Sequence, residues 1–199
     1  KAAIVAARAK TLRYIQLPDS ESFKIEYVTG KSWSGYNWYQ GKFYSLIQIN
    51  TDLPIFIERA LDLACHEGYP GHHVLNVLLE DRLVNQKGWQ EYAIYPLFSP
   101  QSLIAEGLAN YGIELAFPKA ERIEFLKSTL FPLAGLDSKQ VEDYETILEK
   151  ASKLSYAGNY VAKAYLEGQM DSTKAVEWLS TYALFSPERA AQRLKFIEK

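Results

Sequence analysis

Three histidines, the entire histidine content of the chain, stand together with a glutamate in the segment 66–73, HEGYPGHH. Imidazole is the usual nitrogen ligand of zinc in proteins, and the position directly after the first histidine is where a zinc hydrolase places its general base. We therefore expect a site for Zn²⁺ to which His66 contributes a ligand. At this site Glu67 is expected to act as the catalytic base.

The histidines are more widely spaced than in the short form of this motif. Two histidines at i and i+4 share one face of a helix, whereas a residue at i+6 lies about 120° around the helix from the first. Pro70 removes an amide donor and Gly71 tolerates unusual backbone angles, so the helix can bulge or break between the histidines. We expect this break to bring His72 back to the metal, with His73 as the alternative ligand. The histidine that does not bind would support a ligand or face the substrate.

A zinc hydrolase also needs a third protein ligand and an open position for water, and a carboxylate from a neighbouring helix is one solution. Glu106 is the candidate, since it lies in the largely apolar helical segment 102–111. A carboxylate on such a face is costly unless a metal or a cation lies beside it. Gly107 is expected to let a second backbone approach closely. Tyr111, about one turn further on, is a candidate to support the site.

Simpler explanations exist for each part of this pattern. An ordinary buried salt bridge would account for Glu106. A surface turn built on Pro-Gly would account for His72 and His73. The turn leaves His66 and Glu67 unexplained at the end of an apolar helix, so the metal site remains the better interpretation.

Helices must position these residues, and helical periodicity with start and stop signals predicts most of the chain to be helical. Two or three strands are expected where strand formers concentrate, and residues 43–49 would be an edge strand that aligns an extended substrate. The fold class is therefore mainly α with a small β-sheet (α+β), in one domain over residues 1–199. The predicted helices cover residues 1–16, 52–66, 74–84, 99–117, 119–131, 138–166 with possible divisions at Gly158 and Gly168, 172–184 and 186 onward, and the clearest strands are 23–28 and 43–49.

The connection 30–41 is rich in aromatic residues, with Trp33, Tyr36, Trp38 and Tyr39. Four aromatic side chains between glycines could line a substrate cleft. A loop that packs on the core is the simpler interpretation and the one we favour.

Composition excludes several classes of protein. Lys plus Arg is 22 and Asp plus Glu is 24, so a net charge of -2 argues against nucleic acid and anionic membranes as partners. The single cysteine, Cys65, excludes an intramolecular disulfide framework and a cysteine-clustered metal site. The sequence contains no stretch of about 18 uninterrupted apolar residues, so it does not predict a membrane-spanning segment. The chain starts without Met inside a helix-like segment, so we expect a fragment of a longer protein, cytoplasmic or exported.

Two segments resemble a known family. HEGYPGHH at 66–73 is similar to the signature His-Glu-x-x-Pro-Gly-His-His of the family called domain of unknown function 885, a zincin-like group of the gluzincin type. EGLANY at 106–111 is similar to that family's later Glu-Gly-Trp-Ala-x-Tyr segment, with Leu108 in place of the Trp. The resemblance implies a metallopeptidase-like fold with zinc held by His66, by His72 or His73, and by Glu106. It also implies Glu67 as the base.

The expected function is hydrolysis of a peptide or a small amide by a zinc-activated water. A donor to the substrate carbonyl oxygen is also needed, and Tyr69 and His73 are candidates. One alternative is a non-catalytic, metal-containing binding domain, and another is a metal-dependent hydrolase of a different amide or an ester. Glu67 favours catalysis over a structural site, because a structural zinc has no use for a free carboxylate beside it.

Overall fold

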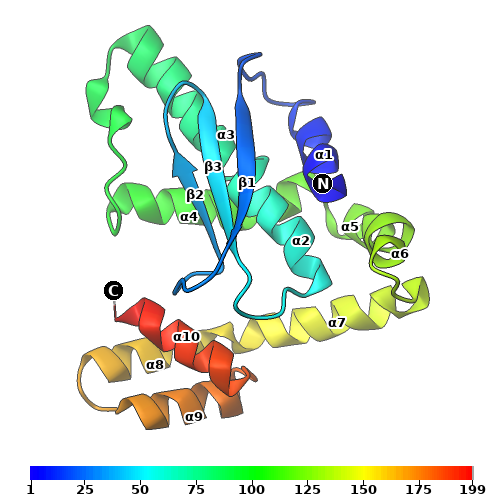
Figure 1. Cartoon of the computed structure of the whole chain (residues 1–199), viewed down its shortest axis with the longest axis vertical. Helices are drawn as coiled ribbons and strands as arrows, with labels where there is room; N and C mark the ends of the chain where they lie inside the picture. The colour runs from blue at the N-terminus through cyan, green and yellow to red at the C-terminus, as the bar shows by residue number, and fades with distance from the viewer. Residues whose placement is uncertain (199) are drawn as a thin grey trace.

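The computed structural model describes residues 1–198 and is mainly helical, with one small three-stranded sheet. This architecture confirms the expected fold class at the level of α+β. In Figure 1 the green and cyan helices cross behind the sheet, and the last three helices, orange to red, gather at the lower end of the view. Among residues 1–198 no helix combines the length and the hydropathy that a membrane crossing requires.

The helices follow the predicted segments but are more often interrupted. The N-terminal part contains α1 (Ala2–Thr11), α2 (Ile57–Leu63), the π-helical turn η1 (Ala64–Gly68), α3 (His72–Leu78), the π-helical turn η2 (Leu79–Asn85), the short η3 (Gln90–Ala93) and α4 (Pro100–Ala116). The C-terminal part contains α5 (Lys119–Phe125), η4 (Leu126–Leu130), α6 (Phe131–Leu133), η5 (Ser138–Gln140), α7 (Val141–Ser152), η6 (Lys153–Ser155), α8 (Tyr156–Leu166), α9 (Ser172–Tyr182) and α10 (Pro187–Ile197).

Several boundaries differ from the prediction. The first helix ends at Thr11 and not at residue 16. The motif helix begins at Ile57 and not at residues 52–54, because Asp52 is used elsewhere: its carboxylate accepts a hydrogen bond from the Gly30 amide at 2.8 Å. The long segment 138–166 divides at η6, and Gly158 lies inside α8. Gly168 has a φ of +72° just beyond α8, a conformation that glycine adopts without steric cost, so it does mark a division.

The sheet has the strand order β1-β3-β2, where β1 is Ser22–Val28, β2 is Gly35–Tyr39 and β3 is Tyr44–Asn50. Strand β3 pairs parallel with β1 and antiparallel with β2. It is therefore the central strand, and the prediction that residues 43–49 form an edge strand is wrong. The reason is that a further strand, β2, forms inside the connection 30–41 and occupies the position beside β3.

The prediction of a loop is accordingly wrong for Gly35–Tyr39. Aromatic residues favour strands, and side chains two positions apart share a face of the sheet. The rings of Tyr36 and Trp38 lie with their centroids 4.6 Å apart. Tyr39, next in the chain, reaches toward η2, where its hydroxyl donates to Glu80. The strand thus presents aromatic side chains on both of its faces.

Buried side chains form two groups. The larger group joins α1, α2, η1, α3 and the end of α4 with η4 and the start of α7, and it includes Leu61, Cys65, Val74, Phe117, Leu126 and Val141. The smaller group lies within α8–α10 and consists of Val161, Ala175, Leu179, Ala190 and Leu194. The candidate ligands all come from elements of the larger group or from helices packed on it.

Helix α4 begins where the sequence predicts. Ser99 is the N-cap, with its hydroxyl accepting a hydrogen bond from the Ser102 amide at 3.1 Å, and Pro100 follows at the first helical position. This cap satisfies one of the free amide donors at the helix start. It fixes the point from which α4 runs past the motif.

We expect Ser99→Ala to lower the free energy of unfolding by about 0.5–2 kcal/mol, because the cap is lost. Urea denaturation measures the change. Ser152→Ala is the control, because it removes an exposed hydroxyl at the C-terminal end of a different helix, α7. This variant should leave the free energy of unfolding within about 0.5 kcal/mol of the parent. Equal stability of Ser99→Ala and the parent would contradict the assigned cap.

Candidate metal centre

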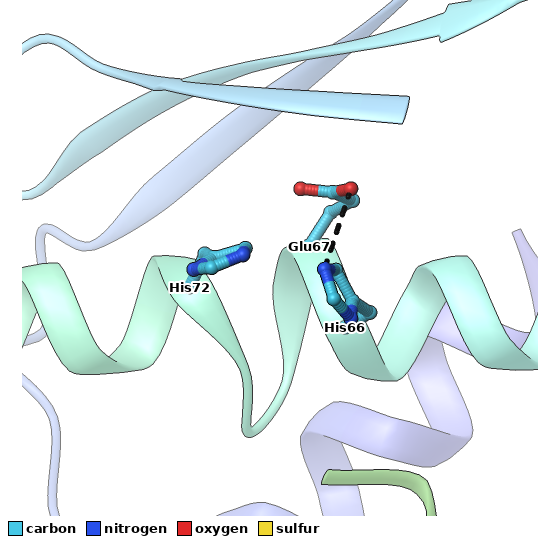
Figure 2. Close-up of side chains that lie close together, drawn as sticks. All are labelled: His66, Glu67 and His72. Carbon is cyan, nitrogen blue, oxygen red and sulfur yellow. Dashed lines mark ion pairs between the residues drawn. The ribbon is translucent and has the colours of Figure 1, made fainter. Parts of the chain in front are cut away.

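The helix is interrupted between the first and second histidines of the chain, His66 and His72. His66 and Glu67 lie in the π-helical turn η1, where backbone hydrogen bonds span five residues instead of the four of an α-helix. His72 is the first residue of α3. The amide of Tyr69 donates to the Ala64 carbonyl at 2.9 Å, and the amide of Gly71 donates to the Cys65 carbonyl at 2.9 Å. Figure 2 shows the result, with the imidazole rings of His66 and His72 turned toward each other across the break and the Glu67 carboxylate beneath the sheet.

Gly71 is the residue that allows this fold-back. A Cβ at its position would lie 1.9 Å from the His66 carbonyl oxygen and 2.4 Å from the Cys65 carbonyl oxygen. No side chain can occupy such a space, so the backbone passes this close only at a glycine. The predicted break at Pro70 and Gly71 therefore has a steric basis in the structure.

Close approach of α4 to the motif depends on small residues. Ala105, Ala109, Gly112 and Ala116 form the buried stripe of α4, and a Cβ on Gly112 would meet the Cys65 carbonyl oxygen at 3.3 Å. The prediction that Gly107 serves this purpose is wrong, because a Cβ there would have no neighbour within 4 Å among the described residues. The contact face of α4 is thus rotated away from the one inferred from the sequence.

Glu106 lies at the margin of that stripe, and its carboxylate joins the two histidines. Oε2 lies 3.5 Å from His66 Nε2, and Oε1 lies 3.4 Å from His72 Nε2. The two imidazole ring centroids are 4.8 Å apart at an interplanar angle of 82°. In a tetrahedral zinc site with metal–donor distances of about 2.0–2.1 Å, two donor atoms lie about 3.3 Å apart. Each Glu106 oxygen thus lies near this spacing from one imidazole, and the three side chains have the chemistry of a zinc ligand set.

Glu67 is close to the same group but differs from Glu106 in its position. Its Oε1 lies 4.0 Å from His66 Nε2, and the donor atoms of His66, Glu67 and His72 all lie within 4.8 Å of one another. Strand β2 covers it: a Cβ on Gly35 would be 2.9 Å from Glu67 Oε1, and the Asn37 side-chain amide donates to the Glu67 carbonyl at 2.7 Å. The separation of Glu67 Oε1 from His66 Nε2 is longer than those of the Glu106 oxygens from the two imidazoles.

The two carboxylates have opposite electrostatic environments. Burial raises the pKa of Glu67, whose side chain is only 5% exposed. Hydrogen bonds from His66 and His72 lower the pKa of Glu106, which is half exposed. Burial by itself would lower the pKa of His66, but its hydrogen bond with Glu106 and the charge of Glu67 outweigh burial and raise it. The pKa values of the two neighbouring glutamates are therefore shifted in opposite directions.

His73, the alternative ligand, points away from this group. Its side chain is fully buried, with Nδ1 2.8 Å from Ser45 Oγ and Nε2 2.9 Å from Glu21 Oε2. The hydroxyl of Tyr69 donates to the same Glu21 oxygen at 2.6 Å. Both nitrogens of His73 and the hydroxyl of Tyr69 are occupied inside the protein. The prediction that one of them donates to a substrate carbonyl is therefore wrong for this structure.

Other aromatic residues meet the expectations only in part. Tyr111 is 59% exposed on α4 and forms no side-chain hydrogen bond within residues 1–198, so the structure gives it no contact that would support the site. Tyr36 is nearer: burial raises the pKa of its hydroxyl, and the charges of Glu67 and Glu106 add to the effect. The Cys65 thiol is buried, which raises its pKa to about 12 and leaves it protonated as a core residue.

Three residues of the site's surroundings were not identified from the sequence. These are Glu21, Ser45 and Asn37, which contact the motif from the segment before β1, from β3 and from β2. Each is a common polar residue in or beside a strand, so its type carries no local signal. Only the packing of the sheet on the motif brings them to it.

Comparison of the chain with protein-family models, with curated proteins and with solved structures finds no match.

Gly71 and Gly107 offer a matched pair of substitutions. Gly71→Ala is expected to lower the free energy of unfolding by more than about 2 kcal/mol, since its Cβ would overlap the backbone of η1. Gly107→Ala is expected to stabilise by about 0.5–1 kcal/mol, because it replaces glycine inside a helix where there is open space. Urea denaturation of both variants tests the fold-back. A Gly71→Ala protein as stable as the parent would show that the chain does not turn back at this residue.

Proposed function

We propose that this protein is a zinc-dependent hydrolase of the zincin type, most simply a metallopeptidase. The observation that carries the proposal is the convergence of His66, His72 and Glu106 beside the buried Glu67, in which the two Glu106 oxygens lie 3.5 and 3.4 Å from Nε2 of His66 and of His72. Two imidazoles and one carboxylate suit zinc better than magnesium or calcium. They leave a fourth tetrahedral position for water or substrate, as a catalytic zinc site requires.

The roles of the residues follow from their environments. Zinc, when bound, supplies a Lewis acid that polarises the substrate carbonyl and lowers the pKa of a water to about 7. His66, His72 and Glu106 would hold the ion. Glu67 accepts the proton of the attacking water and delivers it to the leaving nitrogen. Burial raises the pKa of Glu67, which makes its carboxylate a stronger base than an exposed one.

The arrangement of elements supports a zincin-like fold. The helix that carries His66 and Glu67 packs beneath the sheet, the third ligand comes from a separate helix, α4, and the strand nearest the motif is the antiparallel edge strand β2. These features agree with the resemblance to the gluzincin-type family in the segments 66–73 and 106–111.

Strand β2 is suited to align an extended substrate. The Asn50 amide donates to the Ser34 carbonyl, and the Gln40 amide donates to the Tyr44 carbonyl. Because hydrogen-bonded pairs alternate along antiparallel strands, the main-chain groups of Gly35 and Asn37 point away from β3. An extended peptide can pair with these free groups by adding a strand to the sheet edge. We propose this edge, directly beside Glu67, as the substrate-binding strand.

Metal content and activity test the proposal. We expect about one zinc per chain in protein purified without a nickel column, as measured by plasma mass spectrometry. His66→Ala should lose the zinc, because one of three ligands is missing. Glu67→Gln should keep the zinc and lose about 10²–10⁴-fold in peptide hydrolysis, because it removes the base and no ligand.

Each outcome of this experiment has a distinct meaning. A parent protein without zinc would refute the proposed metal centre. Zinc that is retained without hydrolysis of any peptide, amide or ester in a substrate panel would favour a non-catalytic, metal-containing binding domain. Cleavage of esters only would keep the mechanism and change the substrate class.

The role of β2 is tested by two variants at one residue. Asn37→Ala and Asn37→Pro both lose the side-chain amide that donates to Glu67, but only proline also loses the main-chain donor at the sheet edge. We expect the KM for a peptide to be about tenfold higher in Asn37→Pro than in Asn37→Ala. Equal KM values in two folded variants would argue that the substrate does not pair with this strand.

A further inference from the structure

A buried polar network adjoins the candidate metal centre through Tyr69 and His73. Its centre is Glu21, whose side chain is fully buried in the short segment between α1 and β1. One oxygen of Glu21, Oε2, accepts from the Tyr69 hydroxyl at 2.6 Å and from His73 Nε2 at 2.9 Å. The other oxygen, Oε1, accepts from Arg8 at 2.8 and 2.9 Å.

The charge of this glutamate is well compensated. Burial by itself would raise the pKa of Glu21, but hydrogen bonds from His73, Tyr69 and Arg8 outweigh it and lower the pKa to about 2. Glu21 is therefore a carboxylate and can only accept, so His73 carries a proton on Nε2. The opposite nitrogen of His73 contacts Ser45 Oγ of β3 at 2.8 Å.

The two motif residues that Glu21 holds stand on opposite sides of the break. Tyr69 follows the last residue of η1, and His73 is the second residue of α3, adjacent in the chain to the ligand His72. A single oxygen atom thus bridges the end of one helix and the start of the next. The bridge limits how far α3 can rotate or move relative to η1, and hence how far His72 can move relative to His66.

We propose that Glu21 is the positioning residue of the metal centre, and that it sets the separation of His66 and His72 by clamping Tyr69 and His73 across the break. The inference rests on the proposed function, since it concerns the same metal. It assigns a role to a residue that is distant in sequence from the motif and touches none of the three ligands. It also gives a role to His73, the third histidine of the segment, which does not face the proposed metal.

A merely structural role for Glu21 makes a different prediction, and a matched control separates the two. Glu145 of α7 is a similarly buried carboxylate that accepts from a single arginine, Arg122, and contacts no residue of the motif. Loss of either carboxylate should lower thermal stability. Only the loss of Glu21 should change the affinity for zinc, because only Glu21 holds the break.

The test is the dissociation constant for zinc, measured by competition with a chromophoric chelator, for the parent, Glu21→Gln and Glu145→Gln. The melting temperature of each metal-free protein is measured alongside. We expect Glu21→Gln to bind zinc about 10–100-fold more weakly than the parent, as is typical when a group that orients a metal ligand is removed. Glu145→Gln should bind zinc within about twofold of the parent at a comparable loss of melting temperature.

A second pair of variants covers the case in which Glu21→Gln fails to fold. Tyr69→Phe removes one donor to Glu21, whereas Tyr144→Phe removes a comparable hydrogen bond to Glu58, which lies in the first turn of α2 and away from the break. Weaker zinc binding in Tyr69→Phe than in Tyr144→Phe would support the clamp. If the parent binds zinc but the two tyrosine variants, or the two glutamate variants, have equal affinities for zinc, the proposed clamp is overturned. A parent that binds no zinc would refute the proposed function itself.

Discussion

The candidate site depends on one geometric constraint, which is that residues six apart cannot share a face of a regular helix. His66 and His72 can meet only if the helix stops between them and a second helix starts in a new direction. The structure meets this constraint with a π-helical turn followed by the fold-back at Gly71, where the chain passes against its own carbonyl groups. The other residues of the site either stabilise this break or depend on the position that it gives to His72.

Close packing brings in Glu106, the third of the proposed ligands. Helix α4 lies against η1 along a stripe of small side chains, and a Cβ on Gly112 would lie 3.3 Å from the Cys65 carbonyl oxygen. Small residues allow a short distance between helix axes, and that distance lets the Glu106 side chain at the edge of the stripe reach both imidazoles. Larger side chains on this stripe would move the helix outward and take the carboxylate with it.

Burial gives the two carboxylates different environments. Glu67 lies beneath β2, where burial raises its pKa and so makes its carboxylate a stronger base. Glu106 remains half exposed, and hydrogen bonds from the imidazoles lower its pKa. A pair of acidic groups whose environments shift their pKa values in opposite directions is a recurrent arrangement in hydrolases. Here the sheet causes the difference, because it covers one carboxylate and leaves the other uncovered.

The sequence by itself determined the local features of this protein. The start of α4 at Ser99 and Pro100, the break at Pro70 and Gly71, and the strands β1 and β3 all follow from the types of adjacent residues, because capping, steric freedom and side-chain alternation act over a few positions. Only the tertiary structure decided the strand order, the face of α4 that packs on the motif, the direction of His73 and the contacts of Glu21. These depend on segments that are distant in the chain, and a single sequence carries no local signal of which segments will pack together.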